Sequence, residues 1–391
     1  MTEQAIADLM DLLPIEGPPA KEANVASTIR QKLVSMGIPD GQITHDHAHT
    51  QSEYGGEVGN MIVQIQGRTD QPRLMFSTHM DTVPIAVGCQ PRLEREENRI
   101  VNDAEGCALG GDNRLGCAVL LHLTRELLKR HGDHPPITLV FFVQEEVGLV
   151  GARGLDLSLL GEPVPTMCFN WDGGYAEQFV TAVTGTERFT IDLSGIASHA
   201  GSRPADGLSA AVIAAHAIAE LDSNGWHGHI DRAEGLGSAN VGIVQGGQGS
   251  NVVMPDLNIL AEARSHSSTF RQQIVARWKE AFTSAAQRLT NQNGQHGSVA
   301  FGPGPAYESF ALDENEPTVQ RLLSAAQACD MDAKLVSNNG GMDANWIVAH
   351  GIPAVTIGAG QRDVHKPDEW IDLVDFDRAC RLAVAIADST I

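Results

Sequence analysis

Short apolar runs recur along the first half of the chain, and polar residues follow each of them. The runs are Leu74–Phe76, Ile137–Val143 and Met167–Trp171. Runs this short, rich in β-branched and aromatic residues, are typical of strands that are covered on both faces. Residues 115–129 lie between two of the runs and have the apolar spacing of a helix. Strands that alternate with helices predict a mostly parallel sheet flanked by helices, which is an α/β fold.

The pattern changes after about residue 183. The following segments predict a small antiparallel sheet with two helices: strands at 188–195, 238–247, 252–265 and about 298–310, and helices at 207–221 and 268–290. From about residue 315, helical segments and a short apolar run at 354–357 return to the α/β style. We therefore expect a catalytic domain formed by residues 1–183 and 307–391, with an α+β domain, residues 184–306, inserted into it.

The charge of the chain argues against nucleic-acid and membrane partners. Its 391 residues include 49 acidic and 27 basic ones, which gives a net charge of −22. Such a surface repels nucleic-acid phosphates and anionic lipids, because both are bound mainly through Lys and Arg. The six cysteines form no C-x-x-C motif, and no apolar stretch is long enough to span a bilayer. The N-terminal segment lacks the basic region of a signal peptide, so we expect a cytoplasmic protein.

Histidines and carboxylates follow the predicted strands. His79 and Asp81 follow the first, Glu145 and Glu146 the second, Asp172 the third, and His365 the strand at 354–357, while Asp112 precedes the helix at 115–129. In open α/β sheets, ligands bind outside the carboxyl ends of the strands. Imidazoles and carboxylates without a thiolate suit zinc or a related first-row ion. Five candidate ligands are too many for one tetrahedral ion, but they fit two divalent metals with one bridging carboxylate.

The spacing within two pairs, His79 with Asp81 and Glu145 with Glu146, suggests different roles for the two members of each pair. His79 and Asp81 are two residues apart, so in an extended segment they share a face, and Asp81 could hold the second ring nitrogen of His79. Glu145 and Glu146 are adjacent and point in opposite directions. One of the two glutamates can therefore bind a metal while the other acts as a base on the substrate side.

Several motifs, in order along nearly the whole chain, resemble those of the dinuclear zinc exopeptidases and deacylases. This family includes peptidase T, carboxypeptidase G, and the acetylornithine and succinyl-diaminopimelate deacylases. The motifs are STHMDTVP (77–84), GGDNRLG (110–116), FFVQEEVGLVGARGL (141–155), WDGG (171–174), SHAGSRPADGLSA (198–210), GSNVV (249–253), AEARS (261–265), GGMDANW (340–346) and VHKPDEW (364–370).

The resemblance implies a role for each matching residue. His79, Asp112 and Asp172 would hold one metal, and Asp112 would bridge to a second metal that is completed by Glu146 and His365. Asp81 would orient His79. Glu145 would be the general base, taking a proton from the water between the metals and passing it to the leaving amine. The metals implied are two divalent ions per subunit, zinc above all, with cobalt or manganese as alternatives.

The resemblance also implies roles in the inserted domain. His199 would stabilise the oxyanion and would arrive from the partner subunit of a homodimer formed through this domain. Asn251 and Arg264 fall at substrate-binding positions, and Arg264 could clamp a substrate carboxylate through two hydrogen bonds.

Asp172 narrows the expected substrate to short peptides. Deacylases and carboxypeptidases of the family usually carry Glu at this position, whereas Asp resembles the aminopeptidases and dipeptidases, peptidase T in particular. The pattern departs from the family at Asn113-Arg114 and Lys366-Pro367, and neither departure removes a ligand. We therefore expect a peptidase T-like aminopeptidase. The alternatives are an N-acyl amino-acid deacylase or carboxypeptidase and, more remotely, a non-catalytic binding relative, which the complete set of ligands and base disfavours.

Overall fold

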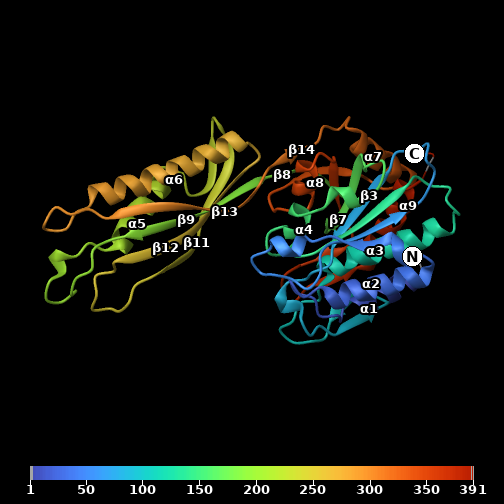
Figure 1. Cartoon of the computed structure of the whole chain (residues 1–391), viewed down its shortest axis with the longest axis horizontal. Coiled ribbons are helices and arrows are strands. Elements are labelled where there is room, and N and C mark those ends of the chain that lie inside the picture. Colours follow the sequence, from blue (N-terminus) through green and yellow to red (C-terminus); the bar gives the residue numbers. More distant parts are fainter. Residues whose placement is uncertain (1–2, 389, 391) are drawn as a thin grey trace. The chain divides into compact units, whose positions relative to one another are not determined.

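The computed structural model describes residues 3–388 and residue 390. The chain divides into two compact units, which are described separately (Figure 1). Unit 1 consists of Met1–Ala182, Ala311–Asn338 and Met342–Ile391, and unit 2 consists of Val183–Phe310 and Asn339–Gly341. Unit 2 is thus inserted into unit 1. The chain enters unit 2 a second time, briefly, at residues 339–341.

Unit 1 is an α/β structure, as the sequence predicts. Its main sheet has the order β1-β2-β6-β3-β7-β16-β8-β14, with β15 paired to β8. These strands are β1 (Ile43–His45), β2 (Met61–Ile65), β3 (Leu74–His79), β6 (Ile137–Phe142), β7 (Met167–Gly173), β8 (Gln178–Val183), β14 (Phe310–Ala311), β15 (Lys334–Asn338) and β16 (Ala354–Gly358). The central strands β6, β3, β7 and β16 are parallel. Strands β1, β2 and β8 pair antiparallel with their neighbours, so the sheet is mixed towards its edges.

The central strands are buried on both faces, which explains their nearly continuous apolar sequences. Every residue of β3, β6 and β16 is buried. Helices then supply the second layer: α3 packs against β3 and β7, and α1, α2 and α9 pack against α3. The helices of unit 1 are α1 (Glu3–Leu12), α2 (Ala23–Met36), α3 (Gly111–Leu128), α4 (Val150–Arg153), α7 (Pro317–Ala328), α8 (Ala344–Ala349) and α9 (Leu373–Ile386).

A small antiparallel sheet in unit 1 was not predicted. It has the order β17-β18-β5-β4 and contains β4 (Pro91–Glu94), β5 (Arg99–Asn102), β17 (Gln361–Arg362) and β18 (Trp370–Asp372). These strands are two to four residues long and only partly buried. Such short strands carry too little apolar periodicity to be recognised in the sequence.

Unit 2 is a five-stranded antiparallel sheet with the order β10-β11-β12-β9-β13. Its elements are β9 (Gly185–Ser194), α5 (Ala210–Ser223), β10 (Gly228–Arg232), β11 (Gly235–Gly246), β12 (Asp256–Ser265), α6 (Ser268–Arg288) and β13 (Ser298–Tyr307). The two helices pack on each other and on the sheet (Figure 1), and they bury a second hydrophobic core around Trp278 and Phe282. Among the described residues of the whole chain, no helix is long and apolar enough to cross a membrane.

Candidate dinuclear metal site

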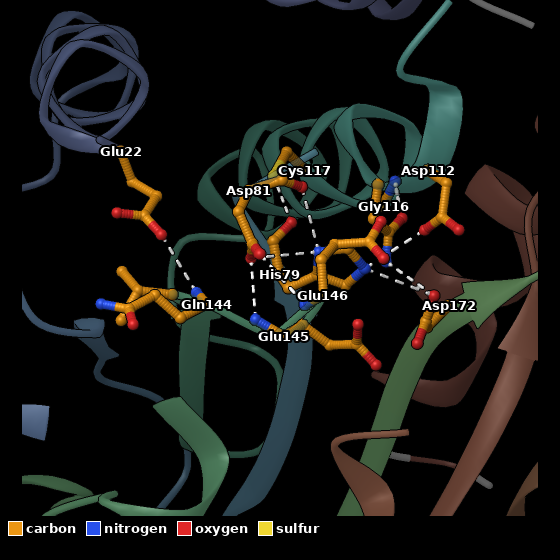
Figure 2. A network of polar contacts seen from close by, with 12 residues as sticks. Glu22, His79, Asp81, Asp112, Gly116, Cys117, Gln144, Glu145, Glu146 and Asp172 are labelled. Carbon is orange, nitrogen blue, oxygen red and sulfur yellow. Dashed lines mark hydrogen bonds and ion pairs between the residues drawn. The ribbon is translucent and has the colours of Figure 1, made fainter. Parts of the chain in front are cut away.

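The candidate ligands of unit 1 lie where the sequence places them, at the carboxyl ends of the central parallel strands. His79 is the last residue of β3, Asp172 lies near the end of β7, and Glu145 and Glu146 follow β6. Figure 2 shows these side chains turned towards one another, with Asp112 from the first turn of α3 facing them. The parallel topology therefore gathers residues that are far apart in the sequence.

Gly116 allows α3 to approach β3 and β7 closely enough to bring Asp112 to the other candidate ligands. A Cβ atom on Gly116 would lie 2.2 Å from Thr78 Oγ1 and 2.8 Å from the carbonyl oxygen of Trp171. Any larger residue would push the start of α3 away from β3 and β7. The neighbouring Asn113 bridges the two elements, because its side-chain amide donates to the carbonyl of Trp171 at 2.6 Å and to Asp172 Oδ1 at 3.3 Å.

Asp112 lies between two histidines and faces each with a different oxygen. His79 Nε2 is 3.2 Å from Asp112 Oδ1 and 3.5 Å from Asp172 Oδ1. His365 Nε2 is 3.3 Å from Asp112 Oδ2 and 3.1 Å from Glu146 Oε1. The five residues thus form two triangles of ligand atoms that share Asp112, which is the arrangement of a bridging carboxylate.

These spacings fit metal coordination. Bonds of about 2.0–2.1 Å to a tetrahedral zinc separate neighbouring ligand atoms by about 3.3 Å, and the four distances range from 3.1 to 3.5 Å. The donors are imidazoles and carboxylates, the set that zinc and related divalent ions bind. Among the described residues, each group of three or more possible ligands within metal-binding reach belongs to this site. The histidines His45, His47 and His49 do not form such a group.

The electrostatics of the site also favour cations. Burial raises the pKa of Glu145 well above its usual value and that of Glu146 to about 7, and it raises the pKa of Asp172. Burial alone would raise the pKa of Asp112 as well, but hydrogen bonds from His365 and His79 hold it below its usual range. Several carboxylates crowded in one buried place repel each other, and divalent cations would relieve that repulsion.

Glu145 and Glu146 occupy different positions within the site. Glu146 lies in the triangle with Asp112 and His365, whereas Glu145 falls in a third group of possible ligands, with His79 and Glu146. In Figure 2 the carboxylate of Glu145 turns away from the Asp81 side. Glu145 is thus next to the ligand set without belonging to either triangle.

Asp81 contacts the segment of the two glutamates in addition to His79. Its carboxylate lies 3.4 Å from His79 Nδ1, while its own backbone carbonyl lies closer to that nitrogen, at 3.1 Å. The two carboxylate oxygens accept the backbone N–H groups of Glu145 and Glu146 at 3.0 and 3.1 Å. Asp81 therefore links the loop after β3 to the glutamate pair.

Two buried glutamates support the site in ways that the sequence did not indicate. Glu369 accepts the backbone N–H groups of Gly110 and Asp112 at 2.8 and 3.1 Å. Glu22 accepts the backbone N–H of Gln144 at 3.1 Å. Burial raises the pKa of Glu369 to about 7 and that of Glu22 to about 8. Proximity to His365 was the only signal that could have identified Glu369, and Glu22 had none.

His199 and Asn251 lie together in unit 2. The residue after Asn251 forms a β-bridge with His199, and the backbone N–H of Ala200 donates to the carbonyl of Asn251 at 2.9 Å. His199 and Asn251 are both exposed. The Nδ1 atom of His199 accepts the backbone N–H groups of Gly201 and Ser202, each at 3.1 Å. An accepting Nδ1 carries no proton, so the neutral ring has its proton on Nε2 and presents a donor there.

Arg264 lies at the other end of β12 from this pair. In the strand register, Asp256 pairs with Ser194 and Arg264 with Thr186, so the two ends are eight residues, or about 26 Å, apart. Arg264 donates through Nε and Nη2 to Glu262 and through Nη1 to the carbonyl of Asn339. A guanidinium has five N–H groups, so two of them take no part in these three hydrogen bonds.

Comparisons with known proteins identify the family to which the chain is similar. The sequence model of peptidase family M20/M25/M40 matches residues 75–389. The chain is 28% identical to the uncharacterized protein YqjE of Bacillus subtilis over 386 residues, which cover 99% of this chain and 98% of that protein.

Two solved structures resemble the chain over nearly its whole length. Aminopeptidase PepT of Bacillus cereus has a TM-score of 0.84 and 29% identity, with 99% of this chain and 98% of that one covered. A tripeptidase of Staphylococcus aureus has a TM-score of 0.87 and 25% identity, with the same coverage. Both similarities extend over unit 1 and unit 2.

Proposed function

The chain belongs to peptidase family M20/M25/M40 and is a metal-dependent hydrolase of peptide bonds; from this premise we propose that it is a peptidase T-like aminopeptidase of di- and tripeptides. The observation that carries the proposal is the similarity of the whole chain to an aminopeptidase and a tripeptidase. Asp172 supports it, because deacylases with similar motifs usually carry Glu at that position.

The ligand set would hold two divalent ions, zinc or in its place cobalt or manganese, and such ions would supply Lewis-acid chemistry at the scissile carbonyl and the attacking water. Glu145 would accept a proton from the attacking water and deliver it to the leaving nitrogen. Its carboxylate lies beside His79 and Glu146 but in neither of the two groups that share Asp112, which supports this role. Asp81 fixes the backbone of the base and orients His79 at the same time.

His199 stabilises the oxyanion that forms on the scissile carbonyl, through the hydrogen of Nε2. The two amide hydrogens on Nδ1 support this role, because they leave Nε2 as the donor. Asn251, next to His199, contacts the peptide. Arg264 binds the C-terminal carboxylate of the peptide through its two remaining N–H groups.

The active molecule is a homodimer in which His199 and Asn251 come from the partner. A tripeptide spans about 10 Å, which is much less than the length of β12 between Asp256 and Arg264. One copy of unit 2 is therefore poorly suited to present Arg264 and His199 to the same peptide. Residues 240–246 of β11 extend beyond the register with β10, and Ile243 and Val244 are 47% and 53% exposed. An open strand edge with exposed apolar residues is a natural pairing surface.

The cysteines support a cytoplasmic location. The six thiols are free, and five of them are buried. Reduced cysteines are typical of cytosolic proteins.

A panel of four substrates tests the proposal: Ala-Ala-Ala, Ala-Ala, N-acetyl-alanine and N-acetyl-Ala-Ala. We expect cleavage of the first two only. Release of acetate from N-acetyl-alanine would instead indicate a deacylase, and release of alanine from N-acetyl-Ala-Ala a carboxypeptidase. The Glu145→Gln variant, purified in the same way, is the control for contaminating peptidases. Activity that is lost on chelation and returns with zinc would support the metal requirement.

A further inference from the structure

The segment that carries the glutamate pair is held by its backbone. Four consecutive N–H groups each donate to a buried side chain from elsewhere in unit 1: Val143 to Asn60 at 3.1 Å, Gln144 to Glu22 at 3.1 Å, and Glu145 and Glu146 to Asp81 at 3.0 and 3.1 Å. Asn60, Glu22 and Asp81 are each 0% exposed. Figure 2 shows the carboxylate of Glu22 next to the backbone of Gln144 and that of Asp81 next to the backbone of Glu145.

Glu22 is the least expected of these three side chains. It precedes α2, where a polar side chain commonly caps the first turn of the helix, but its side chain forms no such cap. Oε1 instead accepts the N–H groups of Ala20 and of Gln144, which is 122 residues away. Oε2 is buried, and no described residue forms a hydrogen bond with it. The side chain thus serves the segment after β6 rather than its own helix.

Gln144 needs such a contact. Its φ angle is +54°, in the left-handed region that residues other than glycine rarely adopt. The side chain of Gln144 is held separately, by Ser52 Oγ and the carbonyl of Gly55. The hydrogen bond that the Gln144 backbone N–H donates to Glu22 is therefore the one that fixes this N–H, directly before Glu145. Without it, a buried N–H would lose its partner, and the peptide would rotate to find another.

We propose that Glu22 is a positioning residue for the general base: by binding the backbone N–H of Gln144, it holds the Glu145 carboxylate beside His79 and Glu146. The proposal rests on the proposed role of Glu145. Glu22 touches none of the five ligand side chains through a hydrogen bond or an ion pair in the described structure, so its loss affects the rate of reaction and leaves metal binding intact.

Three substitutions separate hydrogen-bond acceptance from the ability to ionise. Glu22→Leu removes the acceptor, Glu22→Gln keeps an acceptor oxygen of the same reach but cannot ionise, and Glu22→Asp keeps the carboxyl group but shortens the side chain. We expect Glu22→Leu and Glu22→Asp to lower kcat about 10–100-fold, and Glu22→Gln to retain kcat within about 3-fold. KM and the ratio of metal to protein should change little in all three.

Asp8→Leu is the matched control. Asp8 is also a buried carboxylate at the N-terminal helices, 2% exposed, and it pairs with Lys32 and Arg125 away from the glutamate pair. This variant should lower the unfolding temperature and retain kcat. If Asp8→Leu reduced kcat as far as Glu22→Leu does, the effect would be general destabilisation and the proposal would be wrong.

The decisive measurement combines Glu22 with Glu145. In a Glu145→Gln background, Glu22→Asp should cost little further activity, because residues that act through one another are not additive. A full additional loss, or equal losses for Glu22→Gln and Glu22→Asp in the wild-type background, would overturn the proposal. The proposed function fails separately, if the wild-type enzyme cleaves none of the peptides or if Glu145→Gln alone retains full activity.

Discussion

Unit 1 holds the side chains of His79 and Asp81, and unit 2 those of His199 and Asn251, in opposite ways. In unit 1, His79 and Asp81 are 1% and 0% exposed, and the hydrogen bonds around them join segments that are 30 to more than 200 residues apart. In unit 2, His199 and Asn251 are exposed, and the contacts that orient the His199 ring come from the two residues that follow Ala200. The first arrangement is fixed by the whole fold, and the second by a local turn.

This difference matches two kinds of function, the catalytic reaction and substrate binding. Groups that bind metal and move protons have to be held to within a fraction of an ångström before substrate arrives. Groups that contact substrate can be supplied by an exposed segment, including one from another subunit. Substitutions of the ligands and the base in unit 1 should therefore alter metal content or kcat, whereas substitutions of His199, Asn251 or Arg264 in unit 2 should alter activity without affecting the metals.

The largest expected effect tests this division within unit 1. Glu145→Gln should keep both metals and lower kcat about 10²–10⁴-fold, the usual contribution of a general base. Glu146→Gln, the adjacent control, should lower the ratio of metal to protein. Elemental analysis and kcat on Ala-Ala-Ala check both. If Glu145→Gln lost metal and Glu146→Gln kept it, the two roles would be exchanged.

His199→Ala tests the exposed residue of unit 2. Losing one oxyanion donor typically lowers kcat about 10²–10³-fold, and we expect unchanged metal content and unfolding temperature, because the side chain is exposed. Mixing this variant with Glu145→Gln and allowing subunits to exchange should restore activity. Each heterodimer would contain one intact site, so random exchange should give about a quarter of the wild-type rate. An inactive mixture, with exchange shown independently, would mean that His199 does not act across the dimer.

Arg264→Leu should have a smaller effect, on binding. Hydrogen bonds to a charged group contribute about 1.5–3 kcal/mol, so KM for Ala-Ala-Ala should rise about 10–100-fold. The same peptide with a C-terminal amide is the control. It lacks the carboxylate, so Arg264→Leu should raise its KM much less. Equal losses for the two peptides would assign Arg264 to the structure of unit 2, where it binds Glu262 and Asn339.

The sequence was sufficient to predict the α/β class and the meeting of the candidate ligands at one sheet edge, because both depend on side-chain type. Apolar runs predict buried strands, and His and carboxylates stand at the ends of those runs. The roles of the individual ligands, like the bounds of the inserted domain, remain predictions that the mutations above would test.

The residues that bind the backbone around the site could not be predicted, because their contacts do not depend on the type of the partner's side chain. Glu22, Asn60 and Glu369 bind backbone N–H groups of distant segments. Every residue except proline has a backbone N–H group, so the partner of such a side chain cannot be identified from the sequence. The contacts of Asp81 were predicted only in part, because its contact with His79 joins side chains whereas its contacts with Glu145 and Glu146 are to the backbone.

Glu22 offers the last and smallest prediction, which concerns stability and pH. Burial raises its pKa from 4.5 to about 8 in the folded protein, so ionisation is easier in the unfolded chain than in the folded one. Folding is therefore unaffected by this group below about pH 4.5 and is progressively disfavoured as the pH rises to about 8. Glu22→Gln cannot ionise and keeps the acceptor oxygen, so in protein stripped of metal its unfolding temperature should rise relative to wild type across this range. We expect a difference of a few degrees at pH 8 and little at pH 4.5. Thermal unfolding of both proteins at pH 5, 6, 7 and 8 measures it, and a difference that is constant with pH would mean that Glu22 ionises normally in the folded chain.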